Sequence, residues 1–192
     1  FLPMQFIIKK FLIIYFFIAL LCFQNNLYSN TTNNYIEDYG LISLMYHRFE
    51  ENKYPSTNIK ISDFKKQIEI IQKNNIKFIN PKNFELELKD NKKQRKILLT
   101  IDDGFLSFYE NAWPILKEKK IPFILFVSTK EVGSFNYMNW DQIKKISEED
   151  FVEIGNHSHT HEYLVDENDE AIISDIQKSI TIFKNKLGKN SD

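Results

Sequence analysis

Two adjacent carboxylates, Asp102 and Asp103, directly follow an apolar run at residues 97–101 and precede Gly104. So short an apolar run, without polar alternation, predicts a strand buried on both faces. In sheets built from strand–helix units, sites form at the carboxyl ends of strands. Because neighbouring carboxylates repel each other, we expect a bound cation to keep them ionised, with one aspartate as ligand and the other handling a proton. A polar turn after a buried strand is the alternative.

Three of the four histidines lie in the heptapeptide GNHSHTH at residues 155–161, namely His157, His159 and His161. This cluster follows a short predicted strand at 151–154. His157 and His161 are four residues apart, so one helical turn or a tight loop would bring both imidazoles to one side. Imidazoles and carboxylates together bind divalent transition metals. The cluster is the predicted partner of the acidic pair, the alternative being surface histidines in a polar loop.

The remaining histidine, His47, stands at the carboxyl end of another predicted buried strand, residues 41–46. If this strand is parallel to the strand at 97–101, His47 faces the same rim of the sheet as the acidic pair. The alternative is a histidine that ends a strand and bonds to the backbone.

Strands and helices alternate along the chain. The predicted strands are 41–46, 76–79, 97–101, 122–128 and 151–154, and the predicted helices are 62–74, 81–88 (or a turn), 107–119, 141–146 and 170–187. Such alternation, with right-handed crossovers, predicts a parallel sheet or barrel. The helix at 107–119 contains Pro114, at which we expect it to restart. The charged run at 89–96 is expected to be a solvated loop, although its lysines could meet an anionic substrate.

Apolar spacing predicts how two of the helices pack. In the helix at 62–74, Ser62 can cap the first turn, and apolar residues recur at 64, 68 and 71. The stripe of the helix at 170–187 consists of Ile173, Ile176, Ile180, Phe183 and Leu187. Both helices are expected to cover the sheet with their apolar stripes. A dimer interface is the alternative for the helix at 170–187, but a heptad-like stripe this short is more often part of the core.

With 192 residues, the chain is long enough for one domain with a substantial core and too short to predict two. Its 25 Lys and Arg residues balance 26 Asp and Glu residues, and a net charge of -1 gives no basic field that would argue for a nucleic-acid partner. The aromatic residues Phe135, Tyr137 and Trp140 cluster in one segment, where they could stack on a sugar ring, with core packing as the alternative.

The first segment predicts an export signal at residues 1–29. Lys9 and Lys10 precede an apolar run at 11–23, which a polar stretch follows. The run is shorter than the roughly 18 to 20 residues of a spanning helix, so a cleaved signal is favoured over a membrane anchor. Cys22 is the only cysteine, which excludes an internal disulfide or a thiolate metal cluster. The expected location is periplasmic, extracellular or at the cell envelope, and an uncleaved segment would associate the protein with the membrane.

Two of these stretches resemble known motifs. Residues 100–104, TIDDG, are similar to the T-F-D-D-G motif of the polysaccharide deacetylases of carbohydrate esterase family 4, with Ile in place of Phe. Residues 157–161, HSHTH, match the H-[ST]-x-x-H motif of the same family. Together the two motifs are specific, and the sequence resembles the NodB homology domain that this family shares.

The resemblance implies a role for each residue of the two motifs. Asp103, His157 and His161 would ligate a divalent metal ion, expected to be zinc, and Asp102 would be the general base; His159 occupies a variable position. One carboxylate and two imidazoles leave open positions on the ion for a water and for the acetamide oxygen. A metal-bound water would then attack the carbonyl carbon as it gives a proton to the base.

Residues 44–47, LMYH, resemble the exported deacetylases of poly-N-acetylglucosamine, whose motif order is permuted and whose early Tyr-His supplies the general acid. His47 would then protonate the departing amine, so that acetate and a free amino sugar are released from an N-acetylated polysaccharide. In the commoner motif order, the acid histidine comes late. The arginine-containing motif and further acidic and tryptophan positions of that order are absent from this sequence.

The resemblance spans residues 41–188 and implies a distorted (β/α) barrel of the NodB type. We expect this α/β domain over 41–192, after a lead-in at 30–40, and expect it to be incomplete at the C-terminus because another strand should follow the last helix. Two other functions stay open: a non-catalytic sugar-binding member of the same fold, and a 2-His-1-carboxylate iron oxygenase. The spare aspartate favours hydrolysis, which needs a base beside the metal.

Overall fold

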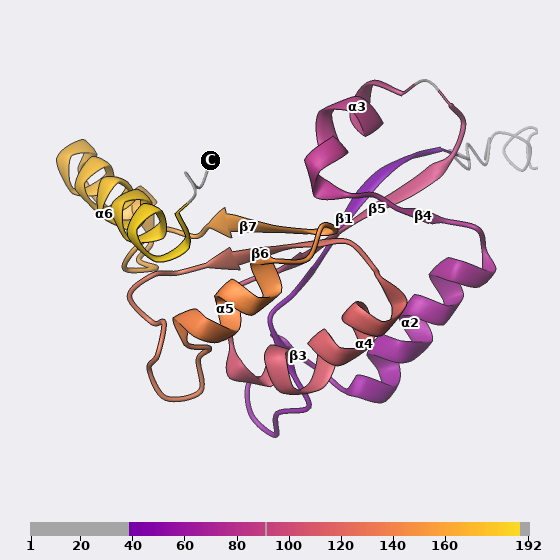
Figure 1. The fold of residues 1–192 in the computed structure, drawn as a ribbon, viewed down its shortest axis with the longest axis horizontal. Helices are drawn as coiled ribbons and strands as arrows, with labels where there is room; N and C mark the ends of the chain where they lie inside the picture. The colour runs from indigo at the N-terminus through magenta and orange to yellow at the C-terminus, as the bar shows by residue number, and fades with distance from the viewer. Residues whose placement is uncertain (1–38, 91, 189–192) are drawn as a thin grey trace, which may run out of the picture. The chain divides into compact units, whose positions relative to one another are not determined.

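The computed structural model describes residues 39–90 and 92–188. The predicted signal peptide and nearly all of the predicted lead-in lie outside the described residues. Among the described helices, none is long and apolar enough to cross a membrane. The described part of the chain is an α/β unit built on a parallel sheet, as predicted (Figure 1).

The sheet runs in the order β1, β5, β6, β7, and β4 also pairs with β5. Its strands are β1 (Gly40–Tyr46), β4 (Lys77–Phe78), β5 (Arg95–Ile101), β6 (Phe123–Val127) and β7 (Val152–Asn156), and a separate pair consists of β2 (Arg48–Phe49) and β3 (Asn58–Ile59). All pairings in the sheet are parallel, so the carboxyl ends of its strands share one edge. Because β1 and β7 end the order, the expected barrel is not closed within the described residues.

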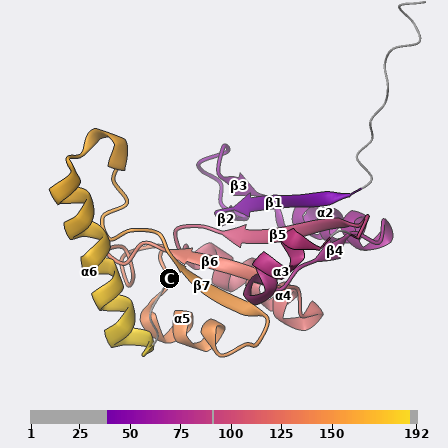
Figure 2. The ribbon, with the colours of Figure 1, turned by 90° about the horizontal axis from the view of Figure 1, so that it is seen from above.

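Helices surround the sheet on several sides. They are α2 (Ile61–Lys73), α3 (Phe84–Lys89), α4 (Trp113–Lys119), α5 (Trp140–Ser147) and α6 (Asp169–Leu187). Figures 1 and 2 show α2, α4 and α5 along one face, and α6 beside the carboxyl ends of β6 and β7. The predicted restart at Pro114 is confirmed, because a π-helical turn, Phe108–Ala112, precedes α4. Proline lacks the N–H that would continue the helical ladder.

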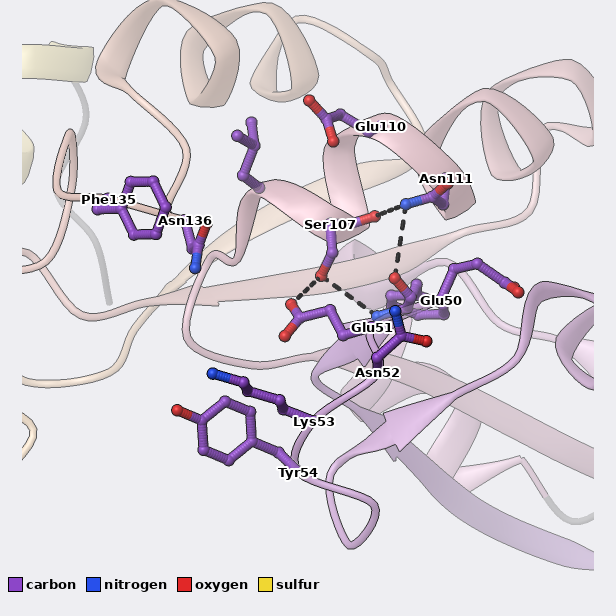
Figure 3. Close-up of a pocket in the computed structure, with 12 residues that line it drawn as sticks. Glu50, Glu51, Asn52, Lys53, Tyr54, Ser107, Glu110, Asn111, Phe135 and Asn136 are labelled. Carbon is purple, nitrogen blue, oxygen red and sulfur yellow. Dashed lines mark hydrogen bonds between the residues drawn. The ribbon is translucent and has the colours of Figure 1, made fainter.

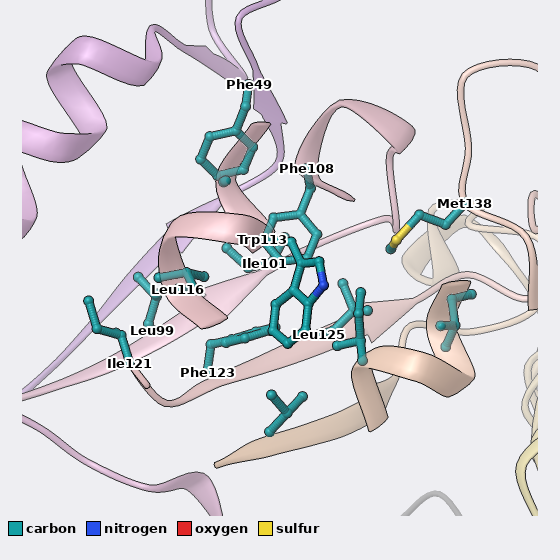
Figure 4. Packing of buried hydrophobic residues seen from close by; sticks show 14 of the residues in the cluster. Phe49, Leu99, Ile101, Phe108, Trp113, Leu116, Ile121, Phe123, Leu125 and Met138 are labelled. Carbon is teal, nitrogen blue, oxygen red and sulfur yellow. The ribbon is translucent and has the colours of Figure 1, made fainter. Parts of the chain in front are cut away.

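The hydrophobic core lies between the sheet and the helices of this face (Figure 4). On β6, Phe123, Leu125 and Val127 are fully buried, and the ring of Phe123 meets those of Phe108 and Trp113 edge-on at 5.5 and 5.8 Å between centroids. Each such buried side chain stabilises the fold by roughly 1.5–3 kcal/mol. The core therefore fixes β5 and β6, and with them the residues at their carboxyl ends.

Strand β1 is an edge strand, which corrects the prediction of a buried one. It pairs with β5 on one side, and its residues Ile42 and Met45 are 63% and 62% exposed. The apolar composition of a short strand does not reveal how many neighbours it has, so sequence alone could not distinguish an edge position from a central one.

Helix α2 buries the predicted residues Phe64, Ile68 and Ile71, but the predicted cap at Ser62 is wrong. The helix begins at Ile61, whose N–H donates to the carboxylate of Glu50 at 2.6 Å. The partner of this first helical N–H is eleven residues away in the sequence. Capping rules that look only at neighbouring residues cannot find such a partner.

Helix α6 turns a slightly different face inward than its apolar stripe predicts. Ile173 and Ile180 are 55% and 38% exposed, whereas Ser179 and Phe183 are buried. The buried Ser179 accepts a hydrogen bond from the Asn156 side chain at 2.8 Å. A polar contact with β7, invisible to hydrophobic periodicity, therefore helps to set the rotation of this helix.

Candidate metal and active site

The carboxyl ends of β1, β5 and β7 bring the predicted site residues to one edge of the sheet. Tyr46 and Ile101 are register partners, so His47 and Asp102 follow paired positions, and the Asp102 N–H donates to the Tyr46 carbonyl at 2.8 Å. On the other side of β5, the His157 N–H donates to the carbonyl of the last residue of β6 at 3.1 Å. The parallel register thus juxtaposes segments that are far apart in the sequence.

Asp103, His157 and His161 form a triangle of possible ligand atoms. The Oδ1 atom of Asp103 lies 3.3 Å from His157 Nε2 and 3.0 Å from His161 Nε2, and the two Nε2 atoms are 3.2 Å apart. Ligands bound at about 2.0–2.1 Å in a tetrahedral zinc site are about 3.3–3.4 Å apart. Two imidazole nitrogens this close need a proton or a cation between them. The donor set and its spacing therefore fit a divalent metal ion.

Left-handed backbone occurs in both segments that supply the triangle. Asp103 and Gly104 have φ angles of 71° and 75°, and Ser158 and His161 have φ angles of 65° and 61°. Gly104 adopts this conformation without a steric penalty, whereas non-glycine residues bear about 1–3 kcal/mol of strain. The histidine pair is thus presented by a tight loop and not by the helical turn that was the other possibility.

The two neighbouring aspartates differ in their electrostatics. Burial raises the pKa of Asp102 above its ordinary value. Burial also opposes the ionisation of Asp103, but its contact with His157 and the charges of the other nearby histidines outweigh burial and lower its pKa. The contact with Asp103 in turn raises the pKa of His157. Asp103 is therefore the better anionic ligand, and Asp102 is the carboxylate more ready to accept a proton.

The other two histidines lie outside the triangle. His47 is half-buried, and its charge favours the ionised form of both aspartates. His159 is buried, and its Nδ1 atom lies 2.8 Å from Thr129 Oγ1. His47 is therefore close enough to the acidic pair to influence its ionisation. His159 is held instead by its contact with Thr129, which follows β6, in keeping with its variable position in the motif.

Arg48 is a neighbour of the site that the sequence analysis did not single out. Its guanidinium lies 3.5 Å from the ring centroid of Phe105 and 4.4 Å from that of Tyr54, and it pairs with Glu51 at 3.0 Å. These contacts fix the segment that follows His47 to the segment that follows the acidic pair. Its place directly after His47 was the available signal, but its contact with Phe105 joins it to a distant segment of the sequence.

A cavity of about 590 Å³ opens beside these contacts (Figure 3). Ser107 lies in its wall, donates to the carboxylate of Glu51 at 2.7 Å and is joined to Asn111 through its carbonyl. Phe135 also lines the cavity and is 90% exposed. Polar side chains and the exposed ring of Phe135 therefore both line this cavity.

The aromatic cluster is divided between surface and interior. Tyr137 packs against Phe105, with 4.7 Å between centroids, and Trp140 meets Phe183 edge-on at 5.8 Å. Phe135 is the exposed member. Core packing therefore explains two of the three residues, and one ring is left in a position where it could stack on a sugar.

Comparison with known proteins gives a family and several relatives. The family model described as polysaccharide deacetylase matches residues 89–192, more than half of the chain. The poly-beta-1,6-N-acetyl-D-glucosamine N-deacetylase of Staphylococcus aureus (strain N315) is 29% identical over 153 residues, which is 72% of this chain and 53% of that protein. The protein of the same name from Staphylococcus epidermidis is 29% identical over 164 residues, covering 78% of this chain and 55% of the relative. The chain thus spans about half the length of these curated relatives.

Solved structures share the fold. IcaB from Ammonifex degensii superposes with a TM-score of 0.70 at 26% identity, covering 80% of this chain and 72% of that chain. The Streptococcus pyogenes deacetylase PplD, solved in complex with acetate, has a TM-score of 0.68 at 21% identity, covering 79% of this chain and 70% of that chain; this likeness concerns the fold alone. The expected NodB-type α/β fold is confirmed, and the chain belongs to the polysaccharide deacetylase family.

Proposed function

We propose that the protein removes N-acetyl groups from an N-acetylglucosamine-containing polysaccharide by metal-dependent hydrolysis. The observation that carries the proposal is the triangle of Asp103, His157 and His161 beside the buried carboxyl group of Asp102. Membership of the polysaccharide deacetylase family supports the reaction class. The name of the curated relatives, poly-beta-1,6-N-acetyl-D-glucosamine N-deacetylase, supports the substrate class.

The proposed ion is zinc, held by Asp103, His157 and His161. Two imidazoles and one carboxylate are the donor set of several catalytic zinc sites, in which a further position stays open to water or substrate. A divalent ion bound there supplies Lewis acidity for the amide carbonyl and for water. The buried carboxylate contributes the negative charge, and the two histidines are partly exposed, so a substrate can reach the ligand triangle from solvent.

Asp102 is the proposed general base and His47 the proposed general acid. Asp102 is 7% exposed, lies outside the ligand triangle, and its Oδ1 atom accepts no hydrogen bond from the described residues. This atom is therefore available to take a proton from the water that attacks the amide, and the raised pKa suits a base. His47, at the end of the adjacent strand, would protonate the departing amine, leaving acetate and a free amino sugar.

The proposal extends to the organisation of the chain. We propose a deacetylase domain over residues 41–192, preceded by a lead-in at 30–40 and an export signal at 1–29. The composition of the first segment supports export, with two lysines before an apolar run. An enzyme that acts on an extracellular or envelope polysaccharide needs such a location to meet its substrate.

The deciding experiment is acetate release from β-1,6-linked N-acetylglucosamine oligomers, with chitin oligomers as the comparison for linkage. Release that a chelator abolishes and added zinc restores is the expected result. Oligomer binding without release, by folded and zinc-loaded protein, would indicate a non-catalytic sugar-binding protein. Oxygen uptake without acetate release would indicate the oxygenase that the same ligand set permits.

A further inference from the structure

We propose that Asp175 of helix α6 is a positioning residue that holds the histidine loop, residues 157–161, in its metal-binding shape. The inference rests on the proposed function, because it concerns the geometry of the same ligand triangle. Asp175 does not touch that triangle itself; it acts through the residues that lie between the two histidine ligands.

Both carboxylate oxygens of Asp175 accept hydrogen bonds from the middle of the loop. Oδ2 accepts the N–H of His159 at 2.7 Å, and Oδ1 accepts the N–H of Thr160 at 2.9 Å and its hydroxyl at 2.7 Å. Hydrogen bonds to a charged acceptor are stronger than those between neutral groups. One side chain thus satisfies two successive backbone N–H groups between His157 and His161.

A second contact from the same helix holds the start of the loop. Ser179, four residues after Asp175, accepts from the Asn156 side-chain amide at 2.8 Å. The Asn156 side-chain oxygen accepts the Ser158 N–H at 2.9 Å, and the Ser158 hydroxyl accepts the His161 N–H at 3.1 Å. This chain of hydrogen bonds leads from α6 to one of the ligand residues, so α6 supports the loop at two points.

The loop needs such support because its shape is strained. Ser158 and His161 both have left-handed backbone, which is unfavourable for non-glycine residues unless the surroundings impose it. The two Nε2 atoms must also stay near their 3.2 Å separation to share one ion. Functional groups that are misplaced by about 1 Å lose much of their effect, so residues that lock ligands in place contribute to metal affinity.

Helix α6 is held to the rest of the fold through its two buried residues, Ser179 and Phe183. Phe183 is 1% exposed and meets Trp140 of α5 edge-on. The helix itself is capped at both ends, because Asn168 accepts the Ala171 N–H at 2.9 Å and Gly188 ends the helix in a left-handed conformation. The docking of α6 is thereby linked to the geometry of the metal site.

The test compares Asp175→Asn with Asp169→Asn, the same chemical change at an exposed position on the same helix. An asparagine cannot accept all three hydrogen bonds, because an NH₂ group, itself a donor, replaces one of the two carboxylate oxygens. Zinc affinity, measured by competition with a chromophoric chelator, should fall by about 10- to 100-fold in Asp175→Asn and stay unchanged in Asp169→Asn. Zinc affinity within about twofold of wild type in Asp175→Asn would overturn the inference.

A second readout does not depend on metal or activity. In metal-free protein, amide hydrogen exchange of the 157–161 segment should be at least about tenfold faster in Asp175→Asn, while exchange within α6 is unchanged. Unchanged exchange in the loop would overturn the inference. If Asp175→Asn does not fold, Thr160→Val removes one of the three bonds and should give a smaller change of the same kind; a loop that exchanges like wild type in this variant would count against the proposal.

These outcomes separate the inference from the proposed function. Wild-type protein that binds zinc but releases no acetate would refute the proposed function, while weakened zinc binding by Asp175→Asn would still support the positioning role. Acetate release by both wild type and Asp175→Asn, with equal zinc affinity and equal loop exchange, would support the function and refute the positioning role.

Discussion

The two ends of strand β5 both carry buried charge, but they compensate it differently. At the amino end, the Lys96 side chain is 3% exposed, and its Nζ atom donates to the Glu87 carbonyl at 2.8 Å and to Asp90 Oδ2 at 3.1 Å. At the carboxyl end, the Oδ1 atoms of Asp102 and Asp103 are buried and receive no well-aligned hydrogen bond from the described residues. Glu87 Oε2 at the amino end also lacks an aligned hydrogen bond, but it lies 3.1 Å from Lys96 Nζ, whereas none of the described ion pairs includes Asp102.

The difference shows how a single strand can serve both stability and chemistry. A buried charge is unfavourable unless it is paired and hydrogen-bonded. At the amino end, Lys96 has its partners in and beside α3, so the charge ties this helix to the sheet. At the carboxyl end, the histidine loop supplies part of the balance, and in the proposed function a cation supplies the rest and takes part in the reaction.

The largest effect is expected for Asp103→Ala, which removes the buried anionic ligand. Zinc affinity should fall by more than about 100-fold, since even outer partners of metal ligands are worth roughly 10- to 100-fold. Acetate release should fall to background. Elemental analysis after gel filtration measures the zinc retained, and a full equivalent of zinc in this variant would remove Asp103 from the ligand set.

Asp102→Asn, like Asp103→Ala, removes one negative charge from the acidic pair, but we expect it to affect turnover and not zinc binding. Zinc content should remain that of wild type, while acetate release should fall by about 10²- to 10⁴-fold, the usual contribution of a general base. Zinc content and turnover are measured on the same preparation. Equal zinc loss in Asp102→Asn and Asp103→Ala would show that the assignment of roles to the pair is wrong.

His47→Gln should lower acetate release from the polysaccharide by about 100-fold without changing zinc content, because the departing amine then lacks its proton donor. An acetyl ester of a phenol, whose leaving group needs no proton, should lose much less activity. Comparing the two substrates isolates the acid step. Equal losses on both substrates, or no loss on either, would leave His47 with a structural role only.

In metal-free protein, the carboxyl end of β5 should lose a contribution to stability around and above neutral pH that the amino end keeps. The contact with Asp103 raises the pKa of His157, so the contribution of the protonated histidine is fully present below about pH 6.5 and is lost as the pH rises through the raised pKa. The lowered pKa of Asp103 adds a loss in acid at this end as well. The pKa of Glu87 is lowered, chiefly by its hydrogen bond with Lys77, so its contribution is present above its ordinary pKa and is lost as the pH falls. Chemical denaturation across pH 3–9 measures both.

Two variants assign these pH effects to their sources. The stability difference between wild type and His157→Gln should shrink above neutral pH, and the difference for Lys77→Met should shrink in acid. The reverse order would contradict the described ion pairs. Zinc affinity should also fall as the pH is lowered, because a protonated His157 cannot bind a metal ion.

The smallest functional effect is expected for Lys96→Met, which keeps the length of the side chain but removes its charge. The unfolding midpoint should fall by roughly 3 to 6 °C, because buried hydrogen bonds to a charged group are lost. Zinc affinity and turnover of the folded protein should match wild type. Lys119→Met, at an exposed position, is the control. A loss of zinc binding in Lys96→Met would show that the two ends of β5 are not independent.

Features that depend on local sequence could be predicted. The apolar runs that became β5 and β6 were recognisable because parallel strands buried on both faces are nearly continuously apolar, whereas β7, with Glu153 in it, was recognisable only as a short segment. The acidic pair and the histidine cluster were recognisable because chemistry-bearing residue types follow those strands directly. Parallel pairing then brings strand ends together whatever their separation in the sequence, which is why the proximity of the acidic pair and the histidine cluster could be predicted, whereas the choice of Asp103 as the ligand came from the family resemblance.

Features that depend on partners distant in the sequence could not be predicted. Glu50 reaches the first turn of α2, Arg48 stacks on Phe105, and Asp175 binds the histidine loop, and each contact joins segments whose proximity only the tertiary fold creates. The exposure of β1 and the rotation of α6 follow from the same kind of contact. Periodicity reports which face of an element is apolar, but not which polar side chains will hold it.

The most direct test is an anomalous difference map from a zinc-soaked crystal, recorded at the zinc absorption edge. The expected peak lies about 2.0–2.2 Å from Asp103 Oδ1 and from the Nε2 atoms of His157 and His161, with Asp102 outside the first coordination sphere. No peak is expected at the Lys96 end of β5. Zinc bound elsewhere, or coordinated by Asp102 in place of Asp103, would contradict the account.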